Sequence, residues 1–141
     1  MKRIIIAAAL LLAVATTAAA KTPQLAPIYK CTGVENGENY TVWLTVEQRD
    51  RAVRLHQLVE DGSVTGVAYG FLKDKTLVVT LSFSSGNFGT ARYEIKGKKL
   101  AGEWQVVGYT EVIPEACEVA ASLPTPIPHE HDHSDNERVE L

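Results

Sequence analysis

Apolar and polar side chains alternate along most of this chain, in short segments separated by turn residues. The alternation is clear in 41–46 and in 52–59, where Val53 and Leu55 share one face and Arg54 lies on the other. A period of two residues is the pattern of a half-buried β-strand. Between residues 28 and 119 we find no apolar spacing of the amphipathic helical type. The sequence therefore predicts an all-β domain.

The segments between these runs are rich in turn residues. The strongest is Glu60-Asp61-Gly62-Ser63, whose Asp-Gly pair favours the positive φ angles of a primed hairpin turn. Pro114 interrupts the last run, which indicates an edge position or a bulge. The expected strands, about eight, are 28–33, 41–46, 52–59, 64–72, 76–83, 88–95, 99–107 and 109–119.

Short strands joined by tight turns predict an antiparallel up-and-down meander. About eight such strands close naturally into a small barrel, which removes the exposed sheet edges. An open sandwich is the alternative, but it usually needs longer crossing connections than this chain offers. Closure would bring the first and last strands together, and these strands carry Cys31 and Cys117.

Cys31 and Cys117 are the only cysteines of the chain. In an exported protein, two cysteines suggest one disulfide. The alternative is a pair of free thiols, one of them catalytic. No histidine stands near either cysteine in the sequence. Residues 1–20, discussed next, are expected to direct the chain to an oxidising compartment, which disfavours free thiols, so we predict the disulfide.

Residues 1–20 have the layout of a secretory signal peptide. A short basic start is followed by an apolar run and by the small-residue site Ala18-Ala19-Ala20. An uncleaved anchor is the alternative, although the run is shorter than the roughly 20 residues of a spanning helix. We expect a periplasmic or secreted protein with a linker at 21–27, a barrel domain at 28–119 and a disordered tail at 120–141 that is first proline-rich and then acidic.

The charge is unevenly distributed along the chain. The formal net charge is −3, and it becomes −5 once Lys2 and Arg3 leave with the signal. The segment from His129 onward carries −4 of this, so the barrel domain is close to neutral with mixed signs. A nucleic-acid partner would need a basic face, and a membrane-surface helix would need a basic amphipathic stretch. We predict no nucleic-acid partner and no membrane span after signal cleavage.

The acidic tail also contains three histidines, His129, His131 and His133, which alternate with acids. Imidazoles and carboxylates together can bind zinc, copper or nickel. The alternative, which we favour, is a solvated tail with adventitious affinity, because a flexible site must be ordered on binding. Apart from this tail we predict no cofactor.

Nothing in the barrel domain forms a recognisable catalytic motif. His56 lies on the polar face of its strand, and the acids are scattered through turns. No phosphate loop, H-E-x-x-H or nucleophile elbow is present. We therefore predict that the protein is not an enzyme.

Aromatic residues are spread through the expected strands and are the best candidates for contact with a ligand. One face of 64–72 consists of Gly66, Ala68 and Gly70, which leaves space for a ligand or for a large neighbour such as Trp104. The neighbour is the commoner case, because protein interiors are close-packed. The candidate ligand-binding residues are Trp43, Tyr69, Phe71 and Trp104.

The motifs Tyr29-Lys30-Cys31-Thr32-Gly33, Tyr93-Glu94-Ile95 and Gly102-Glu103-Trp104, with Tyr40 and the Gly66–Gly70 spacing, resemble those of short exported bacterial proteins sometimes labelled fibronectin-binding-like. In layout these proteins are similar to lipocalin and avidin barrels. The resemblance covers roughly residues 28–118. It implies a barrel, an exported location and a non-enzymatic role.

Three functions remain open from the sequence. The first is a binding module for a small apolar or amphipathic ligand or for a protein partner. The second is a structural or inhibitory envelope protein whose barrel is filled with side chains. The third is metal binding through His129, His131 and His133.

Overall fold

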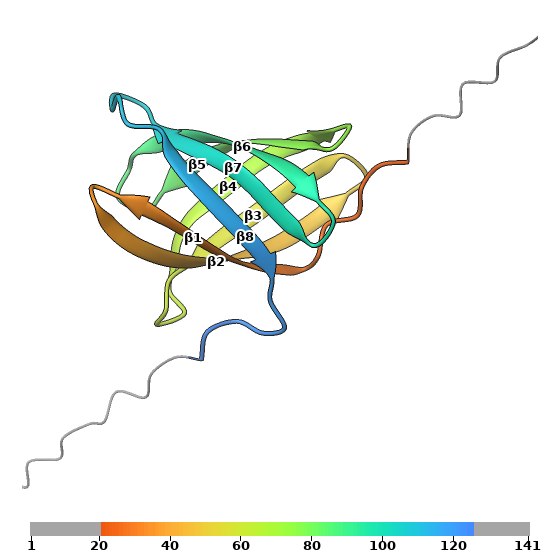
Figure 1. Cartoon of the computed structure of the whole chain (residues 1–141), viewed down its shortest axis with the longest axis horizontal. Helices are drawn as coiled ribbons and strands as arrows, with labels where there is room; N and C mark the ends of the chain where they lie inside the picture. The colour runs from red at the N-terminus through yellow and green to blue at the C-terminus, as the bar shows by residue number, and fades with distance from the viewer. Residues whose placement is uncertain (1–20, 126–141) are drawn as a thin grey trace, which may run out of the picture.

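The computed structural model describes residues 21–125, which form a closed barrel of eight antiparallel strands (Figure 1). Each strand pairs with its sequence neighbours, and β1 pairs with β8. This confirms the predicted all-β barrel. The strands are β1 (Ile28–Glu35), β2 (Glu38–Arg49), β3 (Ala52–Leu58), β4 (Val64–Lys73), β5 (Thr76–Phe83), β6 (Phe88–Lys96), β7 (Lys99–Val106) and β8 (Ile113–Val119).

The alternating pattern separates the interior from the outer wall. In β5, Leu77, Val79 and Leu81 are buried, whereas the residues between them are exposed. An eight-stranded barrel is only wide enough for side chains or one small ligand. Here the middle of the interior is filled by apolar and aromatic side chains. The largest fully buried ones include Tyr29, Leu72, Leu77 and Leu100.

The predicted closure and disulfide are both present. Cys31 and Cys117 lie directly opposite each other in the β1–β8 pairing, with Cα atoms 4.0 Å apart and their sulfurs bonded. Pro114 lies in β8 just beyond the last residue that pairs with β1, which is Glu115 opposite Gly33. On its other side Pro114 pairs with Glu103 of β7, so β8 has neighbours on both sides and is not the edge strand that the proline suggested. The proline lies where the pairing with β1 has ended.

The hairpin at Asp61-Gly62 forms where it is expected, but the predicted primed turn is wrong. Within this hairpin only Gly62 has a positive φ angle, of 82°. The Gly62 N–H donates to the Val59 carbonyl, and the Val59 N–H donates to the Ser63 carbonyl. These bonds enclose a loop longer than two residues, so Asp61 does not need the left-handed conformation that a primed turn demands.

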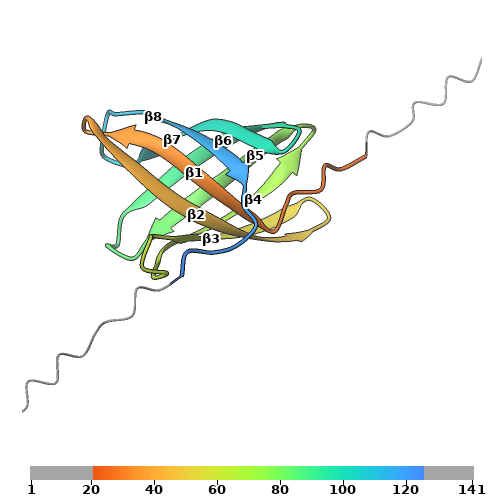
Figure 2. The ribbon, with the colours of Figure 1, turned by 60° about the horizontal axis from the view of Figure 1, so that its bottom comes forward.

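The segment that precedes β1, interpreted from sequence as a linker, contributes to the barrel. The side chain of Leu25 is buried in the core. The Leu25 N–H donates to the Gln48 Oε1, and Gln48 Nε2 donates to the Pro23 carbonyl. Leu25 therefore belongs to the core. Figure 2 shows the segment that carries it leading directly into the start of β1.

The turns at the two ends of the barrel carry charges of opposite sign. Because the strands run up and down, β2–β3, β4–β5 and β6–β7 connect at one end and the other four pairs connect at the opposite end. We call the first the basic end, because its residues 49–52, 73–76 and 96–99 contain seven Lys or Arg and two Asp. We call the second the acidic end, because its residues 35–38, 58–64, 83–88 and 106–113 contain five acids and no Lys or Arg.

Candidate functional site

A single buried acid, Glu115, lies in the interior near the acidic end. Its strand neighbours Ile113 and Cys117 are also buried, so the alternation of β8 places the carboxyl inside. Glu115 is 7% exposed, and it is the one polar or charged side chain among the described residues that counts as buried. Burying a carboxyl is costly unless it has hydrogen-bond partners.

The strand register supplies those partners in one row across five strands. Glu115 lies opposite Gly33 of β1 on one side and opposite Gly102 of β7 on the other. Beyond these glycines the row continues to Tyr40 of β2 and Tyr93 of β6. Two tyrosines thus flank the acid symmetrically, each separated from it by one glycine.

The two glycines let the tyrosine rings reach the acid. A Cβ on Gly33 would lie 2.3 Å from the Tyr40 hydroxyl oxygen, and a Cβ on Gly102 would lie 2.6 Å from Cδ1 of Tyr93. Real Cβ atoms do not approach other atoms so closely. Each ring therefore lies over a glycine that has no side chain to obstruct it.

The row ends in a connected hydrogen-bond network. The Tyr93 hydroxyl donates to Glu115 Oε1 at 2.6 Å, and the Tyr40 hydroxyl donates to Oε2 at 2.7 Å. The indole Nε1–H of Trp104 donates to the Tyr40 hydroxyl oxygen at 2.8 Å. Both carboxyl oxygens accept, so the network suits an ionised Glu115.

Burial dominates the electrostatics of this network. Desolvation raises the pKa of Glu115 above its usual 4.5, although the hydrogen bonds from Tyr93 and Tyr40 oppose that rise. Desolvation, followed by the charge of Glu115, raises the pKa of both tyrosines. Both hydroxyls therefore remain protonated donors at neutral pH.

The network borders a cavity of about 290 Å³ at the acidic end. Tyr40, Phe83 and Trp104 form aromatic walls, with ring centroids 6.3 Å apart for Tyr40–Trp104 and 5.8 Å apart for Phe83–Trp104. Glu35 and Glu115 supply carboxyl groups to the same cavity. We call this cavity the mouth. Aromatic faces and carboxylates together attract organic cations.

The disulfide lies directly beside the mouth network. Sγ of Cys117 is 3.7 Å from Glu115 Oε1, and ligand atoms of Cys31, Glu115 and Cys117 lie within 4.8 Å of one another. The spacing would fit a metal ion, but both sulfurs are bonded to each other. The group is therefore a disulfide beside a carboxyl and gives no argument for a metal site.

Only one of the four candidate ligand-binding aromatics faces this cavity. Trp104 lies in the mouth. Tyr69 and Phe71 are 59% and 53% exposed, and Trp43 is half-buried on the outer wall beneath the Lys30 ammonium. These three candidates therefore lie on the outer wall and not in the interior. Each alternates with buried neighbours, as Phe71 does with Leu72, so the strand pleat directs it outward.

The small-residue face of β4 does point inward, and neighbours fill the space it leaves. A Cβ on Gly66 would lie 3.4 Å from the Phe83 ring. At Gly70 the backbone of β5 approaches so closely that a Cβ would collide with the Val78 carbonyl. The close-packed alternative is therefore the correct one. The predicted metal ligands His129, His131 and His133 lie outside the described residues.

The sequence interpretation missed Glu115, Tyr40 and Phe83. A signal for Glu115 was present, because strand alternation puts it on the same face as Cys117, and cysteine is among the residues most often buried. A charged residue at an inward position is an informative exception in a barrel strand. Tyr40 and Phe83 gave no comparable signal, because their roles depend on register.

No model of a known protein family matches this chain, and comparison with curated proteins finds no relative. Within residues 21–125, no helix is long and apolar enough to cross a membrane. We therefore infer function from the geometry of the mouth.

The raised pKa of Glu115 has a measurable consequence for stability. Between pH 4.5 and the higher folded pKa, the folded protein holds a proton that the unfolded chain releases. Stability contributed by this group therefore falls as pH rises through that window. We expect the unfolding free energy of the wild type to decline relative to Glu115→Gln as pH rises from 4.5, measured by urea denaturation at each pH. A difference that is flat or rises with pH would contradict this.

The glycine row predicts an order of effects for added methyl groups. At Gly102 a Cβ would lie 2.1 Å from the Arg92 carbonyl oxygen, which is backbone, so Gly102→Ala should destabilise by about 1–3 kcal/mol. At Gly33 the obstacle is the movable Tyr40 ring, so Gly33→Ala should cost less stability but displace Tyr40 from Glu115. Thermal denaturation, with Gly66→Ala as a control whose Cβ fits, tests this order.

Proposed function

We propose that this protein is an exported, non-enzymatic binding module whose mouth holds the cationic end of a small amphipathic molecule. The observation that carries the proposal is the mouth itself. Three aromatic walls and two carboxyl groups, Glu35 and Glu115, surround one cavity at the acidic end of the barrel.

The chemistry of the mouth favours a cation over a neutral or anionic group. A cation over an aromatic face gains roughly 0.5–2 kcal/mol, more when water is excluded. Glu115 is held in place by Tyr40 and Tyr93, so it offers a fixed negative charge when ionised. The five acids of the acidic end add a field that concentrates cations at the entrance.

The size of the mouth favours a small ligand. Its volume of about 290 Å³ lies at the lower end of the range for ligand pockets, roughly 300–1,000 Å³. The core side chains below it, among them Leu81 and Val42, are buried and packed together. The ligand would therefore sit at the barrel entrance, with its apolar part against Phe83, Trp104 and Val106.

Export is supported by two observations. The chain contains a disulfide, which is typical of extracellular proteins. Residues 1–20 have the sequence pattern of a secretory signal, although they lie outside the described part of the structure. A periplasmic or secreted location is consistent with both.

Isothermal titration calorimetry with three probes of equal chain length tests the ligand class. We expect hexyltrimethylammonium to bind about tenfold or more tightly than hexanol, and hexanoate to bind least. Trp104→Leu should abolish this preference, whereas Trp43→Leu, on the outer wall, should preserve it. Equal affinity for all three probes, or no affinity for the cation, would overturn the proposal.

A second candidate function is that of an envelope protein that acts through its outer surface. The filled middle of the barrel and the exposed side chains of Tyr69 and Phe71 favour it. The same calorimetry separates the two candidates, because a purely structural barrel would bind none of the probes. Metal binding through His129, His131 and His133 stays a prediction, and deletion of residues 129–141 should abolish it.

A further inference from the structure

The basic end presents a ring of cations around one opening of the barrel. It combines Arg49 and Arg51 from the β2–β3 turn with the lysines of the next two hairpins, Lys73, Lys75, Lys96, Lys98 and Lys99. All are exposed. Two of them lie near acids, Lys96 with Glu94 at 3.8 Å and Lys99 with Glu118 at 3.3 Å, and these ion pairs are solvent-exposed. When Glu94, Glu118 and the turn residues Asp50 and Asp74 are counted against the seven cations, a formal charge of +3 remains at this end.

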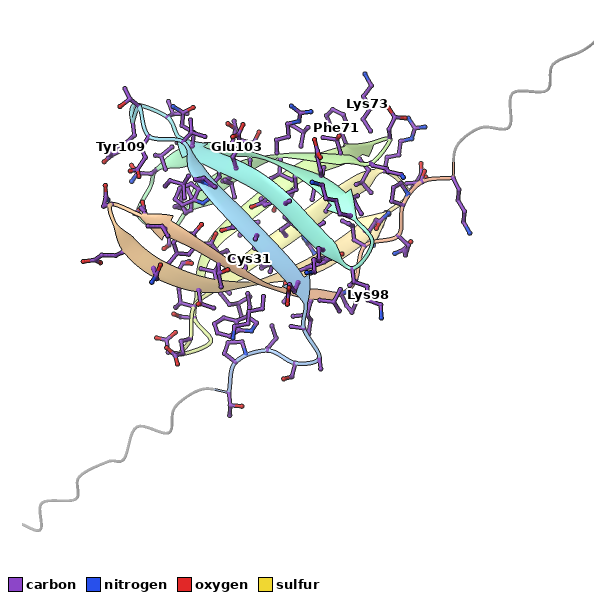
Figure 3. All side chains as sticks on the ribbon, viewed as in Figure 1. Cys31, Phe71, Lys73, Lys98, Glu103 and Tyr109 are labelled. Atoms are coloured by element: carbon purple, nitrogen blue, oxygen red, sulfur yellow. A yellow bond between two sulfur atoms is a disulfide. The ribbon has the colours of Figure 1, made fainter. Side chains whose placement is uncertain are left out.

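An apolar patch lies on the outer wall directly beside this ring. Phe71 of β4 pairs with Val78 of β5, and Tyr69 shares their face. Their exposed fractions are 53%, 38% and 59%. Phe71 is two residues from Lys73, which places it about 7 Å from the rim. Figure 3 shows Phe71 and Lys73 next to each other on the outside of the barrel, with Tyr109 at the opposite end.

We propose that the basic end and the adjoining patch of Tyr69, Phe71 and Val78 dock on an anionic phospholipid surface. Each Lys or Arg close to such a surface contributes roughly 1 kcal/mol of attraction. Amphipathic aromatic side chains such as tyrosine are enriched at the level of the lipid head groups, between the hydrocarbon layer and water. The barrel tilts toward β4 and β5, so that the ring faces the phosphates and the patch enters the head-group layer.

The layout of the surface favours a lipid over a nucleic acid or an acidic protein. The cations lie around the rim of one end, on three separate hairpins. Arg51, Lys75 and Lys96 of the ring also line a cavity of about 780 Å³ at this end, together with the acids Asp74 and Glu94, so the cavity is not lined by cations alone. The apolar side chains lie at one edge of that rim and not between the cations. A planar array of negative head groups with an apolar layer beneath fits this arrangement. Docked in this way, the barrel holds its mouth away from the lipid.

Vesicle sedimentation of the chain that begins at Lys21 tests this docking. The apolar run before Lys21 would bind lipid by itself, and the described residues 21–125 already form a closed barrel. We expect binding to phosphatidylcholine vesicles that contain about one third phosphatidylglycerol, and none to pure phosphatidylcholine. Raising the salt to about 0.5 M should weaken it strongly, because the Debye length falls to a few ångströms.

Matched variants locate the contact. Lys73→Gln combined with Lys75→Gln should lower the affinity about tenfold or more. Lys30→Gln, on the outer wall of β1 on the far side of the barrel, should change it less than about twofold. Phe71→Ser should weaken the binding that persists at high salt. Phe88→Ser should not, although Phe88 is equally exposed, because it lies at the acidic end.

Several results would overturn the proposal. It fails if anionic vesicles are not bound at low salt, or if both vesicle types are bound equally. It also fails if Lys30→Gln weakens binding as much as the double lysine variant. Binding to heparin or single-stranded DNA without vesicle binding would assign the ring to a polymeric anion instead. Each of these results leaves the ligand chemistry of the mouth untouched, because that site lies at the other end.

Discussion

Replacing both Cys31 and Cys117 by alanine is expected to lower the free energy of unfolding by about 2–5 kcal/mol. The disulfide closes a loop with a sequence separation of 86 residues. In the chain-entropy model a loop of this length contributes roughly 4–5 kcal/mol. Because a small domain is stable by only about 5–15 kcal/mol, the variant should lose a large share of its stability.

The bond also holds the one pairing that joins the two ends of the chain. Every other pair of neighbouring strands is linked by a short connection, whereas β1 and β8 are joined through hydrogen bonds and the disulfide. Urea denaturation of the wild type with and without reductant is the measurement. Reduction should bring the wild type to the stability of the double variant, which reductant should leave unchanged. Equal stability of oxidised and reduced wild type would contradict this account.

Glu115→Ala is expected to destabilise the barrel by about 2–4 kcal/mol. The substitution leaves the buried Tyr93 hydroxyl without its acceptor, which costs about 1–3 kcal/mol, and removes packed side-chain atoms as well. Tyr40 is only half-buried, so its hydroxyl recovers a partner from water. Denaturation in urea at pH 7 measures the loss.

Glu115→Gln is the matched control for this variant. It keeps the volume and one carbonyl acceptor while removing the charge, so it should retain most of the stability at neutral pH. The two variants together separate the hydrogen-bond role of the side chain from its charge. If Glu115→Ala proves as stable as Glu115→Gln, the tyrosine network contributes nothing to the fold.

Much of the fold follows from the sequence because it depends on local patterns. Strand positions follow from a period of two, and turn positions follow from residues such as Asp61 and Gly62. Closure of the barrel was indicated by the positions of Cys31 in the first expected strand and Cys117 in the last. These signals do not require knowledge of which strand faces meet inside.

The candidate site was harder to predict because it depends on register. Tyr40, Glu115 and Tyr93 come from distant parts of the chain and meet only in one row of five strands. The outward position of Trp43 and Phe71 did not follow from the sequence, because both faces of their strands carry residues that could belong to a core. Deciding between those faces requires knowing which neighbours are buried, as Leu44 and Leu72 are.

The separation of charge between the two ends was present in the sequence as an alternation of turns. Turns that contain Glu60 or Glu35 carry only acids, and the turns between them contain Lys73, Lys75 and Lys98. The net charge of the barrel domain conceals this, because the two signs nearly cancel. In an up-and-down barrel, alternate turns lie at opposite ends, so the alternation becomes two charged surfaces.

The two tryptophans allow the most direct test of ligand binding in the mouth. The indole N–H of Trp104 donates to Tyr40 within the mouth, whereas Trp43 lies on the outer wall beneath Lys30. In an NMR spectrum of ¹⁵N-labelled protein the two indole N–H signals are separate reporters, assigned with Trp43→Phe. During titration with hexyltrimethylammonium we predict a saturable shift of the Trp104 signal while the Trp43 signal stays in place. A Trp104 signal that does not move, or two signals that move together, would contradict a cation site in the mouth.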